Sequence, residues 1–169
     1  MGTITRDGGA ENTHNLHPAE YRYRRYKLKK LSAVLGGPFL VEGEDLRPLY
    51  RELDSHLITL IFDVPYAESP PGSVTVPFFT GSIKVPAGIF KIAKKTKAAV
   101  VPFYIRDLKG EKVVAEFSDP LEPNNYNEEE FMSLLVSELE MRIRTQPGSW
   151  WLWEALPLLW SKHHDSGGS

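Results

Sequence analysis

The chain has 169 residues, a formal net charge of −2 and 41% hydrophobic residues, and it contains no cysteine. This length is typical of one domain, and the nearly neutral charge disfavours bulk electrostatic binding of nucleic acid. Disulfide bonds, thiolate metal sites and a cysteine nucleophile are excluded. No apolar run approaches the roughly 18 residues that would cross a bilayer, and the N-terminus does not resemble a signal peptide. We therefore expect a cytoplasmic protein that is soluble or peripheral on the inner face of the cell membrane.

The first predicted element is a basic helix. Between residues 21 and 30, six basic residues are interleaved with three tyrosines, and the helix should continue to Leu35 and end at Gly36. A charged run is most often a solvated helix face. The alternative is a surface that binds the phosphate groups of a substrate or of an anionic lipid, a role that suits the planar fork of arginine.

A β–α–β unit is predicted next. Phe39–Val41 reads as a short strand, and the apolar spacing from Leu46 to Leu53 predicts a helix with one buried stripe. The apolar run Leu57–Phe62 predicts a second strand, parallel to the first with a right-handed crossover. Asp63 follows this strand directly, at the edge where open α/β sheets bind ligands.

The middle of the chain combines turn signals with apolar runs. The loop 64–73 is rich in proline and glycine and is a candidate lid or substrate loop. Val74–Phe79 reads as a strand, and Pro77 predicts an edge or a bulge because proline has no amide donor. Pro86 is expected to begin a helix with exposed lysines. Ala98–Arg106 predicts a strand that is covered on both faces.

The last third is expected to contain a hairpin, a long helix and an aromatic segment. A turn at 107–110 should join the preceding strand to a strand at 112–118. Asn127 and Glu130 have the spacing of a capping box that begins a helix ending at Pro147. All four tryptophans fall within eleven residues, and we expect them in the core or at a membrane interface.

Together these elements predict an α/β fold in which a mostly parallel sheet of about five to six strands is flanked by helices. We expect one domain over residues 20–160, with flexible tails at 1–19 and 161–169 because both ends are polar and rich in glycine.

The residues taken alone contain no complete catalytic constellation. His17 and Glu20 have the spacing of a base and its orienting group, but such a pair near a helix start is more often a cap or a surface pair. Asp63 is as consistent with a loop cap as with a substrate contact. No Gly-rich phosphate loop is present, so a nucleotide site has no support.

Several motifs occur in a characteristic order. An Arg-rich segment precedes a strand that ends at Asp63, and V-x-V-P-F-F-x-G follows from Val74 to Gly81. A-x-V-V-P-F-x-x-R then spans Ala98 to Arg106, and E-x-x-I-R at Glu140–Arg144 precedes W-x-W. In order and spacing, residues 20–160 resemble the bacterial lipid A biosynthesis (lauroyl/myristoyl) acyltransferases of the lysophospholipid acyltransferase superfamily.

The resemblance implies transfer of a fatty acyl group from a carrier-protein or coenzyme A thioester to a lipid hydroxyl, without a further cofactor. It also implies a catalytic dyad of a histidine and an Asp or Glu five positions later. No histidine here meets this spacing: the residues five positions after the five histidines are Ala19, Arg22, Ile61, Gly168 and Ser169. The family's usual membrane anchor is absent as well, so the chain resembles a truncated acyltransferase domain.

Site residues are implied by matching motif positions. Asp63 stands in the place of the family's functional Asp, and Arg24 or Arg25 matches an upstream arginine. Phe78, Phe79 and Gly81 match an aromatic turn beside the substrate cleft. For the two phenylalanines, plain core packing is an equally good reading.

Two functions therefore stay open, and whether the chain is an enzyme stays open with them. One is a lipid acyltransferase that is incomplete or inactive alone and takes its base from an absent segment or a partner chain. The other is a non-catalytic module for lipid binding or assembly. Expected partners are a lipid acceptor, an acyl thioester donor, an anionic membrane surface, and a partner chain or a second copy of this chain. A third reading, a nucleic-acid-binding domain, is disfavoured by the charge balance.

Overall fold

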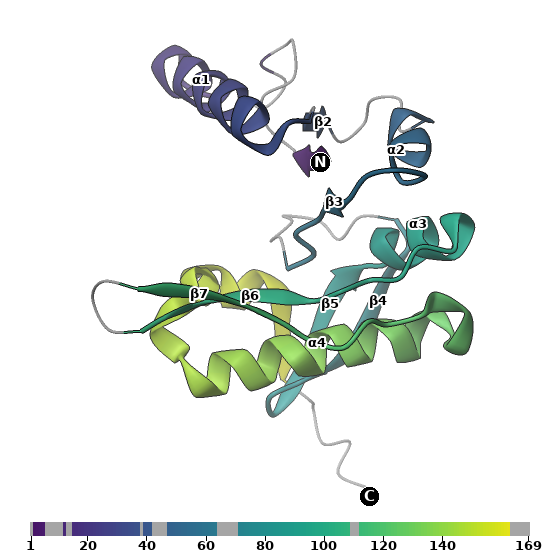
Figure 1. The fold of residues 1–169 in the computed structure, drawn as a ribbon. Coiled ribbons are helices and arrows are strands. Elements are labelled where there is room, and N and C mark those ends of the chain that lie inside the picture. The colour runs from purple at the N-terminus through teal and green to yellow at the C-terminus, as the bar shows by residue number, and fades with distance from the viewer. Residues whose placement is uncertain are drawn as a thin grey trace, which may run out of the picture. The chain divides into compact units, whose positions relative to one another are not determined.

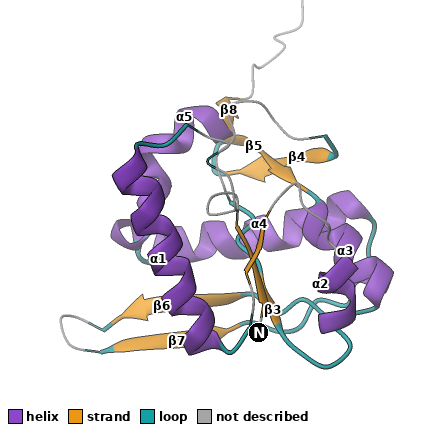
Figure 2. Ribbon diagram, turned by 90° about the horizontal axis from the view of Figure 1, so that it is seen from above, coloured by secondary structure: helices purple, strands orange, loops and turns teal. Residues whose placement is uncertain are grey.

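The structure is a computed structural model that describes residues 2–5, 12, 15–37, 39–41, 47–63, 71–108 and 112–162. It divides into two units, Met1–Ile61 and Phe62–Ser169, whose elements are labelled in Figures 1 and 2. We describe each unit by itself. The predicted loop 64–73 and the predicted tail 161–169 lie largely outside the described residues. Part of the predicted flexible tail 1–19 is a strand, because Gly2–Thr5 pairs with two other strands. The predicted domain bounds stay a prediction.

The first unit contains a small parallel sheet. Its strands are β1 (Gly2–Thr5), β2 (Phe39–Val41) and β3 (Ile58–Thr59), in the order β2-β1-β3. Both outer strands run parallel to β1. The predicted parallel relation between the strands before and after the helix α2 (Arg47–Glu52) is confirmed. However, β1 lies between them, and β3 contains two of the six residues that were predicted.

Helix α1 (Pro18–Leu35) confirms the predicted basic helix. It begins after His17, whose Nδ1 accepts the N–H of Ala19 at 3.3 Å. It ends at Gly36, which has a φ of 69° and donates its N–H to the carbonyl of Ser32. Glycine adopts this left-handed conformation without the steric cost of a Cβ, so the helix ends where the sequence predicted.

The second unit contains an antiparallel sheet. Its strands β4 (Ser73–Phe78), β5 (Gly81–Pro86) and β8 (Trp160–Lys162) lie in the order β4-β5-β8. Pro77 is on the outer strand β4, as predicted. Pro86 pairs with Ser73 as the last residue of β5, and helix α3 (Gly88–Thr96) begins two residues later. The prediction that Pro86 begins the helix is therefore wrong.

A separate antiparallel pair consists of β6 (Phe103–Asp107) and β7 (Val113–Phe117). This confirms the predicted pairing of the two strands, and the predicted turn at 107–110 lies partly outside the described residues. The predicted mostly parallel sheet of five to six strands is wrong. Among the described residues, the strands form three small sheets, and parallel pairing is confined to β1 with its two neighbours. An apolar run is compatible with either strand direction. The run at 98–106 is also not covered on both faces, because Phe103 and Ile105 are exposed.

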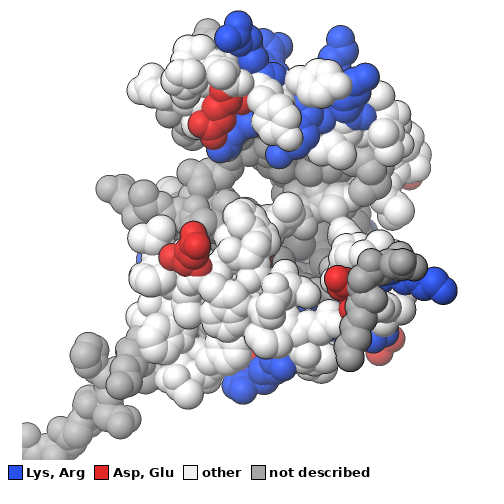
Figure 3. Space-filling model, turned by 90° about the vertical axis from the view of Figure 1, so that its left-hand side faces the viewer, with Lys and Arg blue, Asp and Glu red and all other residues white. Residues whose placement is uncertain are grey.

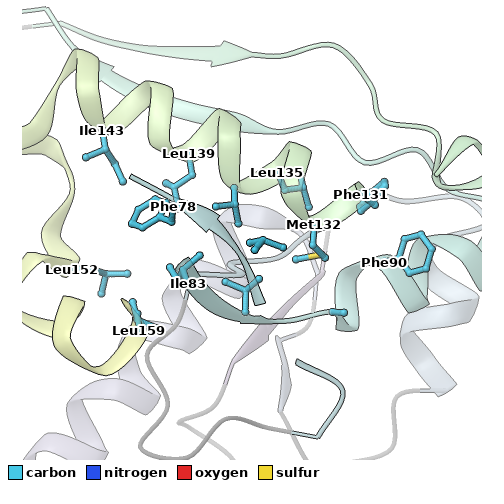
Figure 4. Packing of buried hydrophobic residues seen from close by; sticks show 14 of the residues in the cluster. Phe78, Ile83, Phe90, Phe131, Met132, Leu135, Leu139, Ile143, Leu152 and Leu159 are labelled. Atoms are coloured by element: carbon cyan, nitrogen blue, oxygen red, sulfur yellow. The ribbon is translucent and has the colours of Figure 1, made fainter. Parts of the chain in front are cut away.

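Helix α4 (Glu128–Thr145) begins with the predicted capping box. The Asn127 side chain accepts the N–H of Glu130 at 2.9 Å, and the Glu130 carboxylate accepts the N–H of Asn127 at 3.0 Å. The helix packs on β4. Its buried side chains, among them Met132, Leu135 and Leu139, lie toward Phe78 and Ile83 of the antiparallel sheet (Figure 4).

Short elements complete the second unit around this core. A 3₁₀ helix, η1 (Pro123–Asn125), precedes α4, and two others, η2 (Pro147–Ser149) and η3 (Trp151–Ala155), follow it. The last helix is α5 (Leu156–Leu159), which leads into β8. Trp150, Leu152 and Leu159 from this segment are buried in the core. The tryptophan segment is thereby folded back against β4 and β5.

Candidate functional site

The aromatic pair at the end of β4 has two different environments. Phe78 is fully buried and lies 6.0 Å from Trp150, centroid to centroid. Phe79 occupies the turn between β4 and β5 with a φ of 53°, which is uncommon for a residue other than glycine. The core-packing interpretation therefore holds for Phe78, whereas Phe79 lies in a partly exposed turn.

The turn at Phe79 is held by the E-x-x-I-R motif on α4. Its backbone N–H donates to Glu140 Oε2 at 2.7 Å. Glu140 Oε1 accepts from Arg144 at 2.9 and 2.7 Å, and the Arg144 guanidinium lies 4.8 Å from the centroid of the Phe79 ring. A positive φ costs on the order of 1–3 kcal/mol, and a hydrogen bond to a charged group contributes about 1.5–3 kcal/mol. The Glu140 carboxylate can therefore offset the strain of the turn.

An apolar pocket of about 220 Å³ opens beside this turn. It is lined by residues of the turn, of η3, of α5 and of β8: Phe79, Thr80, Trp153, Leu156 and Trp160. The ring centroids of Phe79 and Trp153 are 6.3 Å apart. Both indole N–H groups are engaged elsewhere, since Trp153 donates to Pro147 O at 2.7 Å and Trp160 donates to Phe78 O at 3.1 Å. The rings thus offer mainly carbon surface to the pocket.

Gly81 permits the close packing of one pocket wall. A Cβ at this position would lie 2.3 Å from the carbonyl oxygen of Ser161 and 2.6 Å from the indole ring of Trp160. These distances are shorter than van der Waals contact, so any side chain would displace β8 or the Trp160 ring. Gly81 therefore shapes the pocket through packing.

Asp63 contacts the aromatic cluster through Trp150. Its Oδ2 accepts the indole N–H of Trp150 at 3.0 Å. Trp150 in turn lies 5.0 Å from Trp153, which lines the pocket. The structure thus brings Asp63, Phe79 and Gly81 into one connected region of the second unit.

Arg24 and Arg25 belong to the first unit. Arg24 pairs with Glu20 at 2.7 Å, and the Arg25 guanidinium lies 5.8 Å from the ring centroid of Tyr21. The predicted role of Arg24 or Arg25 in substrate binding stays a prediction.

A polar network lies between α4 and the β6–β7 hairpin. Glu116 accepts hydrogen bonds from Arg106, at 2.6 Å, and from Arg142, and the bond from Arg106 is the main reason that its pKa lies below the usual value. The Arg142 guanidinium lies 4.9 Å from the ring centroid of Tyr104. Burial, with a smaller effect of Glu138, raises the pKa of Tyr104 to about 12. Tyr104 therefore stays protonated at neutral pH and is not poised as a base.

The described histidines do not form a catalytic relay. His17 caps α1. Ser55 Oγ lies 2.9 Å and Glu52 Oε2 lies 3.2 Å from the same nitrogen of His56, Nδ1. A serine relay requires the nucleophile and the acid on opposite ring nitrogens, so this cluster does not activate Ser55. Across the described part of the chain, no group of three or more His, Asp or Glu side chains is arranged to hold a metal.

Sequence reasoning missed Glu140, Arg144 and Trp153 as site residues. Glu140 and Arg144 belong to the E-x-x-I-R motif, and Trp153 belongs to the W-x-W motif. Neither motif indicates that Glu140 contacts a backbone group 61 residues earlier. The i, i+4 spacing of Glu140 and Arg144 was the one available signal, because such pairs share a helix face.

Comparison with known proteins gives one family. No curated protein sequence matches the chain significantly. Among the described residues, no helix combines the length and the apolar composition that crossing a membrane requires. The family model described as bacterial lipid A biosynthesis acyltransferase matches residues 26–156. This range includes Asp63, the Phe79 turn and the α4 motif, and it begins just after Arg24 and Arg25. The chain belongs to the bacterial lipid A biosynthesis acyltransferase family.

Proposed function

We propose that this chain provides an acyl-chain-binding wall of a lipid acyltransferase and that it does not supply the catalytic base. The family supports an acyltransferase-like function. The observation that carries the proposal further is the apolar pocket beside Phe79, which is walled by Trp153 and Trp160. The donor would be an acyl thioester of a carrier protein or of coenzyme A, and the acceptor would be a lipid hydroxyl.

The pocket has the chemistry expected for a hydrocarbon ligand. Its tryptophan N–H groups are already bonded to Pro147 and Phe78, so a ligand would meet ring carbon and the Leu156 side chain. Each methylene that leaves water contributes about 0.8 kcal/mol. A volume of about 220 Å³ is below the range of about 300–1,000 Å³ that is usual for whole ligands. The pocket would therefore hold part of an acyl chain.

We infer from the positions of the histidines that another segment or a partner chain supplies the catalytic base. A dyad would need an Asp or Glu five residues after a histidine, and none of the five histidines meets this requirement. His17 and His56 both make local contacts near their own backbone. We therefore expect the isolated chain to bind acyl chains without transferring them.

Acyl-chain binding can be measured by quenching of tryptophan fluorescence with a brominated fatty acid. Trp153→Ala should weaken binding by about tenfold, which corresponds to about 1.4 kcal/mol. Trp151→Ala is the matched control, because Trp151 is 81% exposed and does not line the pocket. Equal weakening by both substitutions would show that the pocket is not the binding site.

Acyl transfer is tested separately, with an acyl thioester and either a lysophospholipid or a lipid A precursor. We expect no turnover by the isolated chain. Turnover that disappears in His17→Ala would show that the chain carries its own base. Binding without turnover, even when the adjacent reading frames are co-expressed, would favour the second candidate, a non-catalytic lipid-binding module. The missing dyad is the observation that keeps this candidate open.

A further inference from the structure

Helix α1 exposes a stripe of two tyrosines and one valine, with Lys30 among them. Tyr23 is 63% exposed, Tyr26 is 60% exposed and Val34 is 81% exposed. An α-helix turns about 100° per residue, so these positions and Lys30 fall within about 80° of one another. Large exposed aromatic and aliphatic side chains on one helix face are typical of an interaction surface.

Cations flank this stripe on both sides. By the same helical geometry, Arg22 and Lys29 lie along one border and Lys27 lies along the other, and all three are exposed. The helix contains six basic residues and one acidic residue, Glu20, which pairs with Arg24 at 2.7 Å. Figure 3 shows Lys and Arg side chains gathered over this helix, with uncharged side chains between them. The positive charge is local, because the whole chain has a net charge of −2.

We propose that α1 binds the surface of an anionic lipid bilayer and lies parallel to it. In this orientation, Tyr23, Tyr26 and Val34 would face the boundary between head groups and acyl chains, where tyrosine is favoured. The flanking cations would reach the lipid phosphates on their flexible stems. Interfacial helices combine aromatic or aliphatic side chains on one face with Lys and Arg beside them, and α1 has both. This inference does not depend on the acyl-chain pocket, which lies in the second unit.

The stripe favours a bilayer over single-stranded nucleic acid. Nucleic acid would use the arginines and could stack bases on the tyrosines. It would not use an aliphatic side chain in the same stripe, and here Val34 is exposed toward the end of the helix. Burial in the head-group region accounts for this aliphatic side chain as well as for the cations.

Sedimentation with lipid vesicles tests the proposal. The full chain is mixed with phosphatidylcholine vesicles that contain either no phosphatidylglycerol or about 30% of this anionic lipid. We expect binding to the anionic vesicles only, with weaker binding at about 0.5 M salt than at about 0.05 M because salt screens exposed charges. Absence of binding to anionic vesicles at low salt would overturn the proposal.

A charge-matched pair of variants locates the surface. Substitution of Arg22, Lys27 and Lys29 together by glutamine should reduce the bound fraction at low salt, with an apparent affinity loss of about tenfold or more. The control removes the same charge from exposed lysines of the second unit, through Lys84→Gln, Lys91→Gln and Lys97→Gln. It should change the affinity by less than about twofold, because the proposal places none of these lysines in the bilayer contact and salt screens exposed charges that do not touch the lipid. Equal losses in the two variants would indicate attraction by bulk charge and would refute the assignment to α1.

The apolar stripe requires a separate variant. Tyr23→Ser combined with Val34→Ser leaves every charge in place, and it should weaken vesicle binding at both salt concentrations. Circular dichroism must show the wild-type helix content in each variant. If the double variant binds vesicles like the wild type, the stripe does not enter the interface. If the chain binds polyuridylate more tightly than anionic vesicles under the same conditions, α1 is a nucleic-acid surface and the proposal is wrong.

Discussion

Substitution of Glu140 by alanine should loosen the Phe79 turn. The carboxylate accepts the Phe79 N–H at 2.7 Å and pairs with Arg144 at 2.7 Å. Loss of a hydrogen bond to a charged acceptor costs about 1.5–3 kcal/mol. The i, i+4 ion pair adds about 0.3–0.5 kcal/mol, because Arg144 is exposed and water screens the charge. We expect the free energy of unfolding to fall by about 2–3.5 kcal/mol in total.

Urea unfolding followed by circular dichroism measures this loss, and a thermal scan should show a melting temperature lower by about 4–14 °C. Glu140→Gln keeps an acceptor oxygen for the Phe79 N–H and should recover about half of the loss. Glu129→Ala is the control, because Glu129 is an exposed carboxylate on the same helix. If Glu140→Ala and Glu129→Ala lower stability equally, the carboxylate does not support the turn. Loosening of the turn should also weaken acyl-chain binding, since Phe79 lines the pocket.

Two further substitutions test packing and titration in the second unit. Gly81→Ala should destabilise the chain by about 1–3 kcal/mol through overpacking and shift the fluorescence of the displaced Trp160 to the red. Gly148→Ala should stay within about 0.5 kcal/mol of the wild type, because nothing lies within 4 Å of its added Cβ; equal effects would contradict the close contact at Gly81. Burial raises the pKa of Tyr104 from 10.0 to about 12, so its stabilisation is complete below pH 10 and is lost as the pH rises toward 12. Denaturant titrations across this range should show a smaller decline for Tyr104→Phe than for the wild type, and an unchanged decline would refute the raised pKa.

Local structure could be predicted wherever the determining contacts lie within a few residues. The end of α1 at Gly36 and the capping box at Asn127 and Glu130 depend on hydrogen bonds between neighbours in sequence. The hairpin between β6 and β7 was likewise predicted from a local turn. Strand direction was not predictable in this way, because an apolar run has the same appearance in parallel and antiparallel sheets. The apolar content of 98–106 also gave no indication that one face of β6 would be exposed.

The candidate site was predicted in part, for a similar reason. Motif matching indicated Asp63, Phe79 and Gly81. In the second unit, Asp63 is linked to Phe79 through Trp150 and Trp153, and the role of these residues in substrate binding stays a prediction. Motif matching could not indicate what holds them, because each is fixed by a residue far along the chain: Trp150 at Asp63, Glu140 at Phe79 and Trp160 at Gly81. Phe78 and Phe79 are adjacent residues with the same side chain, so the sequence does not distinguish their roles. The backbone geometry of the turn buries Phe78 in the core and places Phe79 in the pocket wall.

The contacts of Asp63, Phe79 and Gly81 with residues far along the chain suggest that these three motif positions share one role. Asp63 accepts the indole N–H of Trp150, which packs against Trp153. Gly81 leaves space for Trp160, and Glu140 fixes the backbone of Phe79. Each position therefore orients an aromatic ring that lines the pocket or packs on its wall. Under the proposed function, loss of the Asp63 carboxylate would release the Trp150 indole and so weaken acyl-chain binding through the aromatic cluster.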